Sequence, residues 1–252
     1  MPFFIWWYTK NGDKMTISIK ESNINYIQYG SGEDVVLLHG WGQNIEMMKP
    51  LGDTLSNKKV TILDFPGFGS SEEPNKAYTI YDYVEILEEF LKKLEIKNPT
   101  LIGHSFGGRV AIVYASRNKT EKLILFGAPC IRKRKKNIKE ELLKKAKKLP
   151  GMNKIGEIAK KYIGSTDYKN ATPIMRETLV NVVNEDLSEY AKKIICPTLL
   201  IWGTLDQEAP IEDALEMETI LKDGALIKLE GYTHYAYLEA LPQVSNILHN
   251  FI

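Results

Sequence analysis

The segment Gly103-His104-Ser105-Phe106-Gly107 has the G-x-S-x-G pattern of a nucleophile elbow. In such an elbow a serine sits on a sharp turn between a strand and a helix, in a strained backbone conformation. Glycines two positions to either side remove side chains that would collide at the turn. The short apolar run at 99–102 predicts the strand, and the period of residues 110–114 predicts a helix with one buried face. We therefore expect Ser105 to act as a nucleophile at a helix N-terminus, where free N–H groups favour an anion.

A serine hydroxyl is a weak nucleophile until a base removes its proton and a carboxylate orients that base. The chain has four histidines. His39 and His104 flank glycines beside predicted strands, where a structural role is expected, and His249 lies in the predicted terminal helix. His234 lies in a loop after a strand, at the carboxyl edge where open α/β sheets bind ligands. It is the candidate base.

The orienting carboxylate should follow another strand, so that it reaches the same edge of the sheet. Asp206 does so, at the end of the segment Ile-Trp-Gly-Thr-Leu-Asp at 201–206. Asp64 also follows a strand, but it precedes the elbow, and the Gly-rich turn around it indicates a loop-shaping role. These residues predict a triad of Ser105, His234 and Asp206.

The elements that must position these groups alternate along the chain. A hairpin at 16–29 is followed by apolar strands at 35–38, 59–63, 99–102, 122–126, 197–202 and 225–229. Helices are expected at about 46–56, 79–94 and 211–221. Two more are expected directly after the elbow and at the C-terminus. Alternation of this kind predicts a mostly parallel, twisted, doubly wound α/β sheet with helices on both faces.

Between residues 129 and 193 the strand patterns disappear. Only helical patterns remain there, at about 138–148, 154–163 and 174–184, and the segment is too long for a loop. The expected division is therefore an α/β core of 1–128 and 194–252 with an inserted helical cap of 129–193. The part at 130–161 is strongly basic, with 13 Lys and Arg against 3 Asp and Glu.

Length and composition fit one large α/β domain, since 252 residues with 44% hydrophobic and 26% charged side chains are ordinary for a globular protein. The net charge of +1 gives no sign of nucleic-acid binding. Cys130 and Cys196 make no disulfide framework, so a reducing cytoplasm is expected. The apolar start at 1–8 is too short for a signal peptide, and no apolar run suggests a membrane span.

Five segments of the chain together resemble the α/β-hydrolases that use a serine nucleophile and carry a cap. They are His-Gly-Trp-Gly at 39–42, Asp-Phe-Pro-Gly-Phe-Gly-Ser at 64–70, the elbow at 103–107, Trp-Gly-Thr-Leu-Asp at 202–206 and Gly-Tyr-Thr-His at 231–234. The resemblance covers residues from about 24 to 252, and Ser105, Asp206 and His234 follow the family's chain order. The elbow serine excludes the relatives with an aspartate there, haloalkane dehalogenases and epoxide hydrolases.

The resemblance implies acyl transfer from an ester to water through an acyl-enzyme, with no metal and no organic cofactor. It also implies an oxyanion hole made by the backbone N–H groups of Trp41 and Phe106. An apolar substrate pocket is expected from Trp41, Phe68 and Phe106. Cys130 is a candidate for the mouth of that pocket, although a small buried filler is the favoured interpretation.

Two features resemble pimeloyl-carrier-protein methyl ester esterases within this superfamily. They are the opening Ile-Trp-Trp at 5–7 followed by Thr-Lys, and the His-Gly-Trp-Gly segment followed by Asn44. The basic segment could dock an acidic carrier protein by charge steering, or could be a solvated lysine-rich helix face. The hairpin at 13–30 departs from that family.

Several functions therefore stay open for one set of residues. The first hypothesis is a serine carboxylesterase that acts on a small-molecule ester. A thioesterase or carrier-protein methyl ester hydrolase, a C–C hydrolase or lyase of this fold, and a ligand-binding receptor without turnover are the alternatives, and fold alone cannot choose among them.

Overall fold

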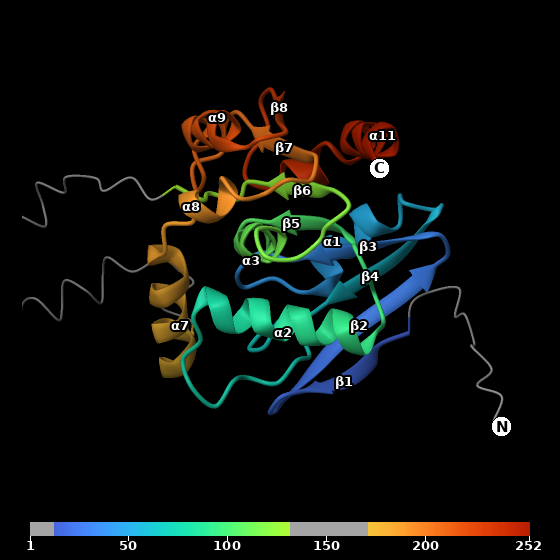
Figure 1. Ribbon diagram of the computed structural model, residues 1–252, viewed down its shortest axis with the longest axis vertical. Helices are drawn as coiled ribbons and strands as arrows, with labels where there is room; N and C mark the ends of the chain where they lie inside the picture. The colour runs from blue at the N-terminus through green and yellow to red at the C-terminus, as the bar shows by residue number, and fades with distance from the viewer. Residues whose placement is uncertain (1–12, 132–170) are drawn as a thin grey trace, which may run out of the picture.

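The computed structural model describes residues 13–131 and 171–252. In this part of the chain eight strands form a single sheet in the order β1-β2-β4-β3-β5-β6-β7-β8 (Figure 1). The strands are β1 (Met15–Ile19), β2 (Ser22–Gly30), β3 (Glu33–Leu38), β4 (Lys58–Leu63), β5 (Thr100–His104), β6 (Leu123–Phe126), β7 (Thr198–Gly203) and β8 (Gly224–Leu229). β2 pairs antiparallel with β1 and β4, and every other pairing is parallel. The predicted hairpin and mostly parallel sheet are confirmed.

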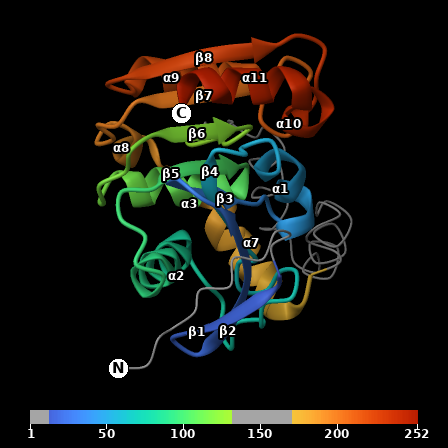
Figure 2. The same ribbon diagram turned by 90° about the vertical axis from the view of Figure 1, so that its right-hand side faces the viewer.

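Helices cover both faces of the sheet, as Figure 2 shows in side view. The helices are α1 (Ile45–Gly52), α2 (Ile80–Lys93), α3 (Phe106–Ala115), α7 (Pro173–Asn184), α8 (Ser188–Ala191), α9 (Ile211–Ile220), α10 (Ala236–Glu239) and α11 (Leu241–Phe251). One apolar core packs α2, α3 and α9 on one face, and a second packs α1, α10 and α11 on the other. This two-sided burial explains why the central strands are apolar throughout rather than alternating.

Helix α2, the longest among the described residues, forms where its sequence predicts it. Thr79 Oγ1 accepts a hydrogen bond from Asp82 N, and the Asp82 carboxylate accepts one from Thr79 N, which completes a capping box. A cap of this kind stabilises a helix by about 1 kcal/mol. The buried face of α2 consists of Ile80, Tyr83, Val84, Ile86, Leu87, Phe90 and Leu91. This face holds α2 against α3, the helix that begins at the elbow.

Asp64 has the loop-shaping role that the sequence indicates. Its carboxylate is buried and accepts hydrogen bonds from Ile45 N at 2.7 Å and from Ser70 N and Asn25 Nδ2, both at 2.8 Å. These bonds tie the start of α1 to the turn after β4. Because its carboxylate accepts three hydrogen bonds from surrounding loops, we assign Asp64 a structural role.

Helix α1 ends earlier than expected, at Gly52 rather than near residue 56. Leu55 continues the apolar period that suggested a longer helix, but it packs into the core from the following turn. Gly52 itself is closely packed, because a Cβ there would lie 2.6 Å from Tyr29 Oη. Periodicity alone does not distinguish a buried turn residue from one more helical position.

Between β6 and β7, the described residues form the helices α7 and α8, and α7 matches the helix predicted at 174–184. The helices expected at 138–148 and 154–163, most of the basic segment at 130–161, and the opening at 1–8 lie outside the described residues. The proposed division into core and cap stays a prediction. Within residues 13–131 and 171–252, none of the helices has the length and apolar character needed to cross a membrane.

Candidate active site

Ser105 joins β5 to α3 with φ +48° and ψ −111°. A non-glycine residue with positive φ is strained, typically by about 1–3 kcal/mol, and such strain concentrates at functional sites. The flanking glycines allow this turn: a Cβ on Gly103 would lie 2.5 Å from Gly108 Cα, and one on Gly107 would lie 2.3 Å from Leu38 O. The strained elbow expected from the sequence is confirmed.

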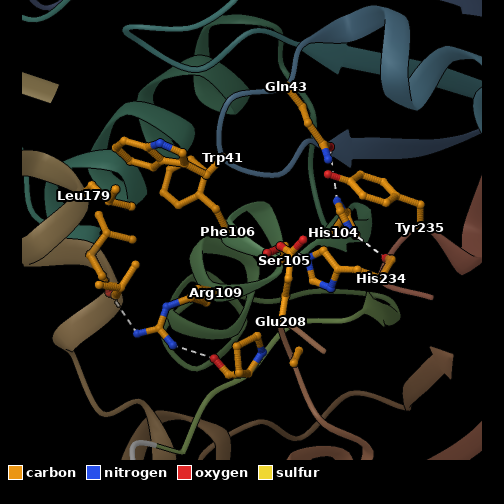
Figure 3. Close-up of a pocket in the computed structure, with 14 residues that line it drawn as sticks. Trp41, Gln43, His104, Ser105, Phe106, Arg109, Leu179, Glu208, His234 and Tyr235 are labelled. Carbon is orange, nitrogen blue, oxygen red and sulfur yellow. Dashed lines mark hydrogen bonds and ion pairs between the residues drawn. The ribbon is translucent and has the colours of Figure 1, made fainter. Parts of the chain in front are cut away.

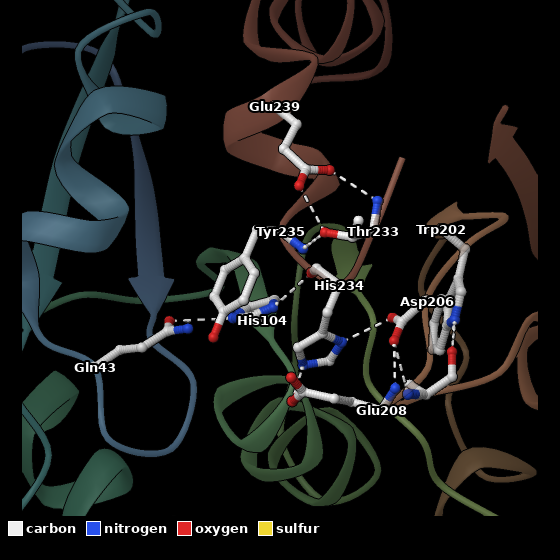
Figure 4. A network of polar contacts seen from close by, with 10 residues as sticks. Gln43, His104, Trp202, Asp206, Glu208, Thr233, His234, Tyr235 and Glu239 are labelled. Carbon is white, nitrogen blue, oxygen red and sulfur yellow. Dashed lines mark hydrogen bonds and ion pairs between the residues drawn. The ribbon is translucent and has the colours of Figure 1, made fainter. Parts of the chain in front are cut away.

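His234 and Asp206 lie side by side, although they come from loops after different strands. His234 Nδ1 donates to Asp206 Oδ2 at 2.7 Å, and both side chains are buried. The other oxygen, Asp206 Oδ1, accepts from Glu208 N at 2.9 Å and from Ala209 N at 2.8 Å. Both carboxylate oxygens of Asp206 are therefore engaged (Figure 4). This arrangement favours a proton on Nδ1 of the imidazole and a lone pair on Nε2.

Ser105 and His234 line the same cavity, which has a volume of about 490 Å³ (Figure 3). One wall is apolar and consists of Trp41, Phe106 and the α7 residues Leu179, Val182 and Val183. The geometry thus combines a hydroxyl, an imidazole backed by a carboxylate, and an apolar wall in one enclosed space. Such a cavity suits an uncharged organic group next to a nucleophile–base pair.

The residues expected to bind substrate divide into three groups. Trp41 and Phe106 line the cavity with Ser105, with their rings 5.6 Å apart. Phe68 instead lines a second cavity of about 400 Å³, which shares Trp41 with the first. Cys130 is 1% exposed and lines neither of these cavities, and burial raises the pKa of its thiol to about 12. Cys130 is therefore a buried filler rather than a residue of the pocket mouth.

The expected oxyanion donors lie in suitable segments. Phe106 is the first residue of α3, so its N–H has no acceptor within the helix. Trp41 lies in the turn after β3, where Gln43 N donates to Gly40 O at 3.2 Å. The role of these two N–H groups stays a prediction.

Three further polar residues line the cavity and were not found from the sequence: Gln43, Glu208 and Tyr235. Glu208 Oε2 lies 3.5 Å from His234 Nε2, on an exposed side chain. No motif marks these residues. The only available signal is that Glu208 follows Asp206 by two positions and Tyr235 follows His234 directly.

His104 is fully buried beneath the imidazole of His234, with the two ring centroids 4.7 Å apart. His104 Nε2 lies 3.0 Å from the backbone oxygen of His234, and its Nδ1 lies 3.1 Å from Gln43 Oε1. Burial lowers the pKa of His104 to about 3, with further lowering from the neighbouring His234. The ring is thus neutral at physiological pH.

Arg109 ties the apolar wall to the elbow helix. From α3, its guanidinium donates to the backbone oxygens of Val182 at 3.0 Å, Glu185 at 2.6 Å and Pro129 at 2.5 Å. Since two of these acceptors lie at the end of α7, the bonds hold α7 against the cavity. Figure 3 shows the Arg109 side chain in the lining of the cavity. Among the residues that the structure describes, no group of three or more His, Cys, Asp or Glu side chains could hold a metal ion.

A family model described as "alpha/beta hydrolase fold" matches residues 35–154. The AB hydrolase superfamily protein YisY of Bacillus subtilis is 24% identical, over 97% of this chain and 98% of its own length. A pimeloyl-[acyl-carrier protein] methyl ester esterase of Aliivibrio fischeri is 23% identical, over 88% of this chain and 95% of its own. The structure of an esterase from Exiguobacterium antarcticum superposes with a TM-score of 0.75 and 23% identity, over 95% of this chain and 98% of that one, which shows a shared fold.

The sequence match, the relatives and the topology of the sheet all indicate the α/β-hydrolase fold. The pairing order, the elbow between β5 and α3, and the helices on both faces are those that the resemblance implies. The chain has the α/β-hydrolase fold, and its sequence is similar to members of that superfamily.

Proposed function

We propose that the protein is a serine carboxylesterase that cleaves a small or medium acyl ester with Ser105, His234 and Asp206. One observation carries the proposal. The strained elbow serine and the His234–Asp206 pair come from distant parts of the chain, yet Ser105 and His234 line one cavity. A structural serine would not require a backbone at φ +48° beside an imidazole that a carboxylate orients.

The reaction proceeds in two steps. Ser105 Oγ attacks the ester carbonyl carbon while His234 Nε2 takes the hydroxyl proton, and the proton then passes to the departing alcohol. A water molecule next gives a proton to Nε2 and attacks the acyl carbon. The bond between that carbon and Ser105 Oγ then breaks, Nε2 returns the proton to Oγ, and the carboxylic acid leaves. The N–H groups of Trp41 and Phe106 stabilise the oxyanion in both steps, a contribution of about 2.7–4 kcal/mol per donor.

The relatives support an ester as the substrate. The chain is similar to proteins named as an esterase, a lipase and a methyl ester esterase. Both cysteines are free, which fits our assignment of the reaction to the cytoplasm.

A carrier-protein methyl ester is the second candidate substrate. It is favoured by the methyl ester esterase relatives and by the basic segment at 130–161, which could steer an acidic partner. If this candidate is correct, reversing the charges of Arg132, Lys133 and Lys136 weakens binding of an acidic acyl carrier protein, and more so at low salt. Unchanged binding at low salt would leave the solvated-face interpretation of the segment.

A panel of p-nitrophenyl esters with acyl chains from acetyl to palmitoyl tests the main proposal, with Ser105→Ala as the matched control. We expect a burst of p-nitrophenol followed by steady turnover, and loss of nearly all activity in the variant. Tight binding without turnover would indicate a receptor instead. Turnover restricted to thioesters or to C–C substrates would assign one of the other reactions of this fold.

A further inference from the structure

His104 connects the three loops that form the candidate site. It precedes Ser105 directly, so it is fixed by β5. On one side its Nε2 meets the backbone oxygen of His234, and on the other its Nδ1 meets Gln43 Oε1, which also accepts from Gly40 N at 3.0 Å. Figure 4 shows the ring between the two loops. One buried side chain thus touches the segments that carry the candidate base and the candidate oxyanion donor.

Each of the two contacts of the His104 ring would require the single ring proton on a different nitrogen. A neutral imidazole has a single N–H, whereas the His234 carbonyl and Gln43 Oε1 are both acceptors. If the proton is on Nε2, the ring donates to the His234 carbonyl and attracts the loop. If the proton is on Nδ1, the lone pair on Nε2 faces that carbonyl oxygen and repels the loop. The tautomer of His104 therefore decides whether the ring holds the His234 loop.

We propose that His104 is a positioning residue, whose Nε2–H donates to the backbone oxygen of His234 and holds the imidazole of that residue over Ser105. This inference rests on the proposed function, because it assigns to His104 a task in presenting the base. The ring is buried from solvent, so water cannot replace the bond.

Two other contacts hold different parts of the loop that carries His234. Glu239 holds the preceding residue, because its carboxylate accepts from Thr233 N at 2.7 Å and from Thr233 Oγ1 at 2.6 Å. Asp206 holds the imidazole through Nδ1. The bond from His104 fixes the backbone of His234 itself. Since a displacement of about 1 Å at a reacting group can reduce a rate about 100-fold, loss of this bond should lower kcat while it leaves KM nearly unchanged.

Two variants of one residue separate the two tautomers. The amide nitrogen of a glutamine reaches the place of Nε2, whereas that of an asparagine reaches only the place of Nδ1. We expect His104→Gln to keep kcat for a p-nitrophenyl ester within about threefold of wild type. We expect His104→Asn to lower kcat about 10- to 100-fold at unchanged KM. His249→Asn, at an exposed histidine of α11, is the matched control and should equal wild type.

A spectroscopic measurement checks the proposal even where a variant folds poorly. In ¹⁵N-histidine-labelled wild-type protein at pH 7, the Nε2 resonance of His104 should have the shift of a protonated ring nitrogen, and Nδ1 that of a bare one. The reverse assignment would overturn the proposal. Equal kcat in the Asn and Gln variants would overturn it as well, while the proposed function is tested separately by the loss of turnover in Ser105→Ala.

Discussion

Gly127 leaves room for His234. The glycine follows β6 with φ +50°, and a Cβ built on it would lie 2.8 Å from His234 Nδ1 and 3.1 Å from Asp206 Oδ2. The missing side chain therefore lets the imidazole and the carboxylate meet. A glycine outside every motif of the sequence is a condition for the His234–Asp206 hydrogen bond.

Replacing Gly127 with alanine should reduce activity strongly. The new methyl group forces His234 and Asp206 apart, and the left-handed backbone adds about 1 kcal/mol of strain. We expect kcat/KM for a p-nitrophenyl ester to fall at least about 100-fold, with a melting temperature lower by a few degrees.

Gly231→Ala is the control for this loss, because Gly231 has φ +82° and no atom within 4 Å of its Cβ position. It should lower stability to a similar degree and keep activity within a few-fold. Equal losses of activity in the two variants would show that backbone strain, rather than the contact with His234, is responsible.

Asp206→Asn should abolish most activity without unfolding the loop. The asparagine oxygen can still accept from Glu208 N and Ala209 N, but its NH₂ group would face His234 Nδ1 and favour the wrong tautomer of the ring. We expect kcat to fall about 10⁴-fold with a melting temperature near that of wild type. Full activity in this variant would remove Asp206 from the mechanism.

The free energy of unfolding should decrease as the pH falls below about 6.5, and His104 should account for part of the slope. Burial lowers the pKa of folded His104 to about 3, whereas the unfolded residue titrates near 6.5. Between these values the unfolded chain binds a proton that the folded chain does not, so this residue removes about 1.4 kcal/mol of stability per pH unit. Urea unfolding from about pH 7 to about pH 4 should give a shallower slope for His104→Gln. Parallel curves would contradict the assignment.

Trp41→Ala should change the preferred acyl chain. Trp41 lines both cavities, and its ring packs against those of Phe68 and Phe106, with centroids 4.8 and 5.6 Å away. Removing the indole joins the two spaces. We expect the optimum in a p-nitrophenyl ester series to move to longer acyl chains, with activity on the shortest ester reduced less than in Ser105→Ala. An unchanged optimum would show that substrate does not reach the second cavity.

The sequence predicts most of the sheet because its signals are local. Apolar runs mark β3, β5 and β7, and the capping box at Thr79 marks the start of α2. The elbow motif is local in sequence, and Gly103 is required by its contact with Gly108 nearby, whereas Gly107 is required by its contact with Leu38 O at the end of β3. Asp64 could be given a structural role because the turn around it is rich in glycine.

The remaining parts of the site depend on contacts between distant loops. Gln43, Glu208 and Gly127 carry no motif, and they matter only because folding brings them next to His234 or His104. Cys130 shows the limit of spacing in another way. Its position after β6 allows either the pocket mouth or a buried filler, and the structure places the side chain in the core, a choice that sequence spacing does not encode.

The most direct test of the account is labelling with a fluorophosphonate, followed by peptide mass spectrometry and an ester assay on the same samples. We predict one adduct per chain, on the peptide that contains Ser105, with hydrolysis lost in proportion to labelling. Ser105→Ala should show neither adduct nor turnover, and His234→Ala should label far more slowly. Wild-type turnover in Ser105→Ala, or an adduct on another residue that abolishes activity, would contradict the account.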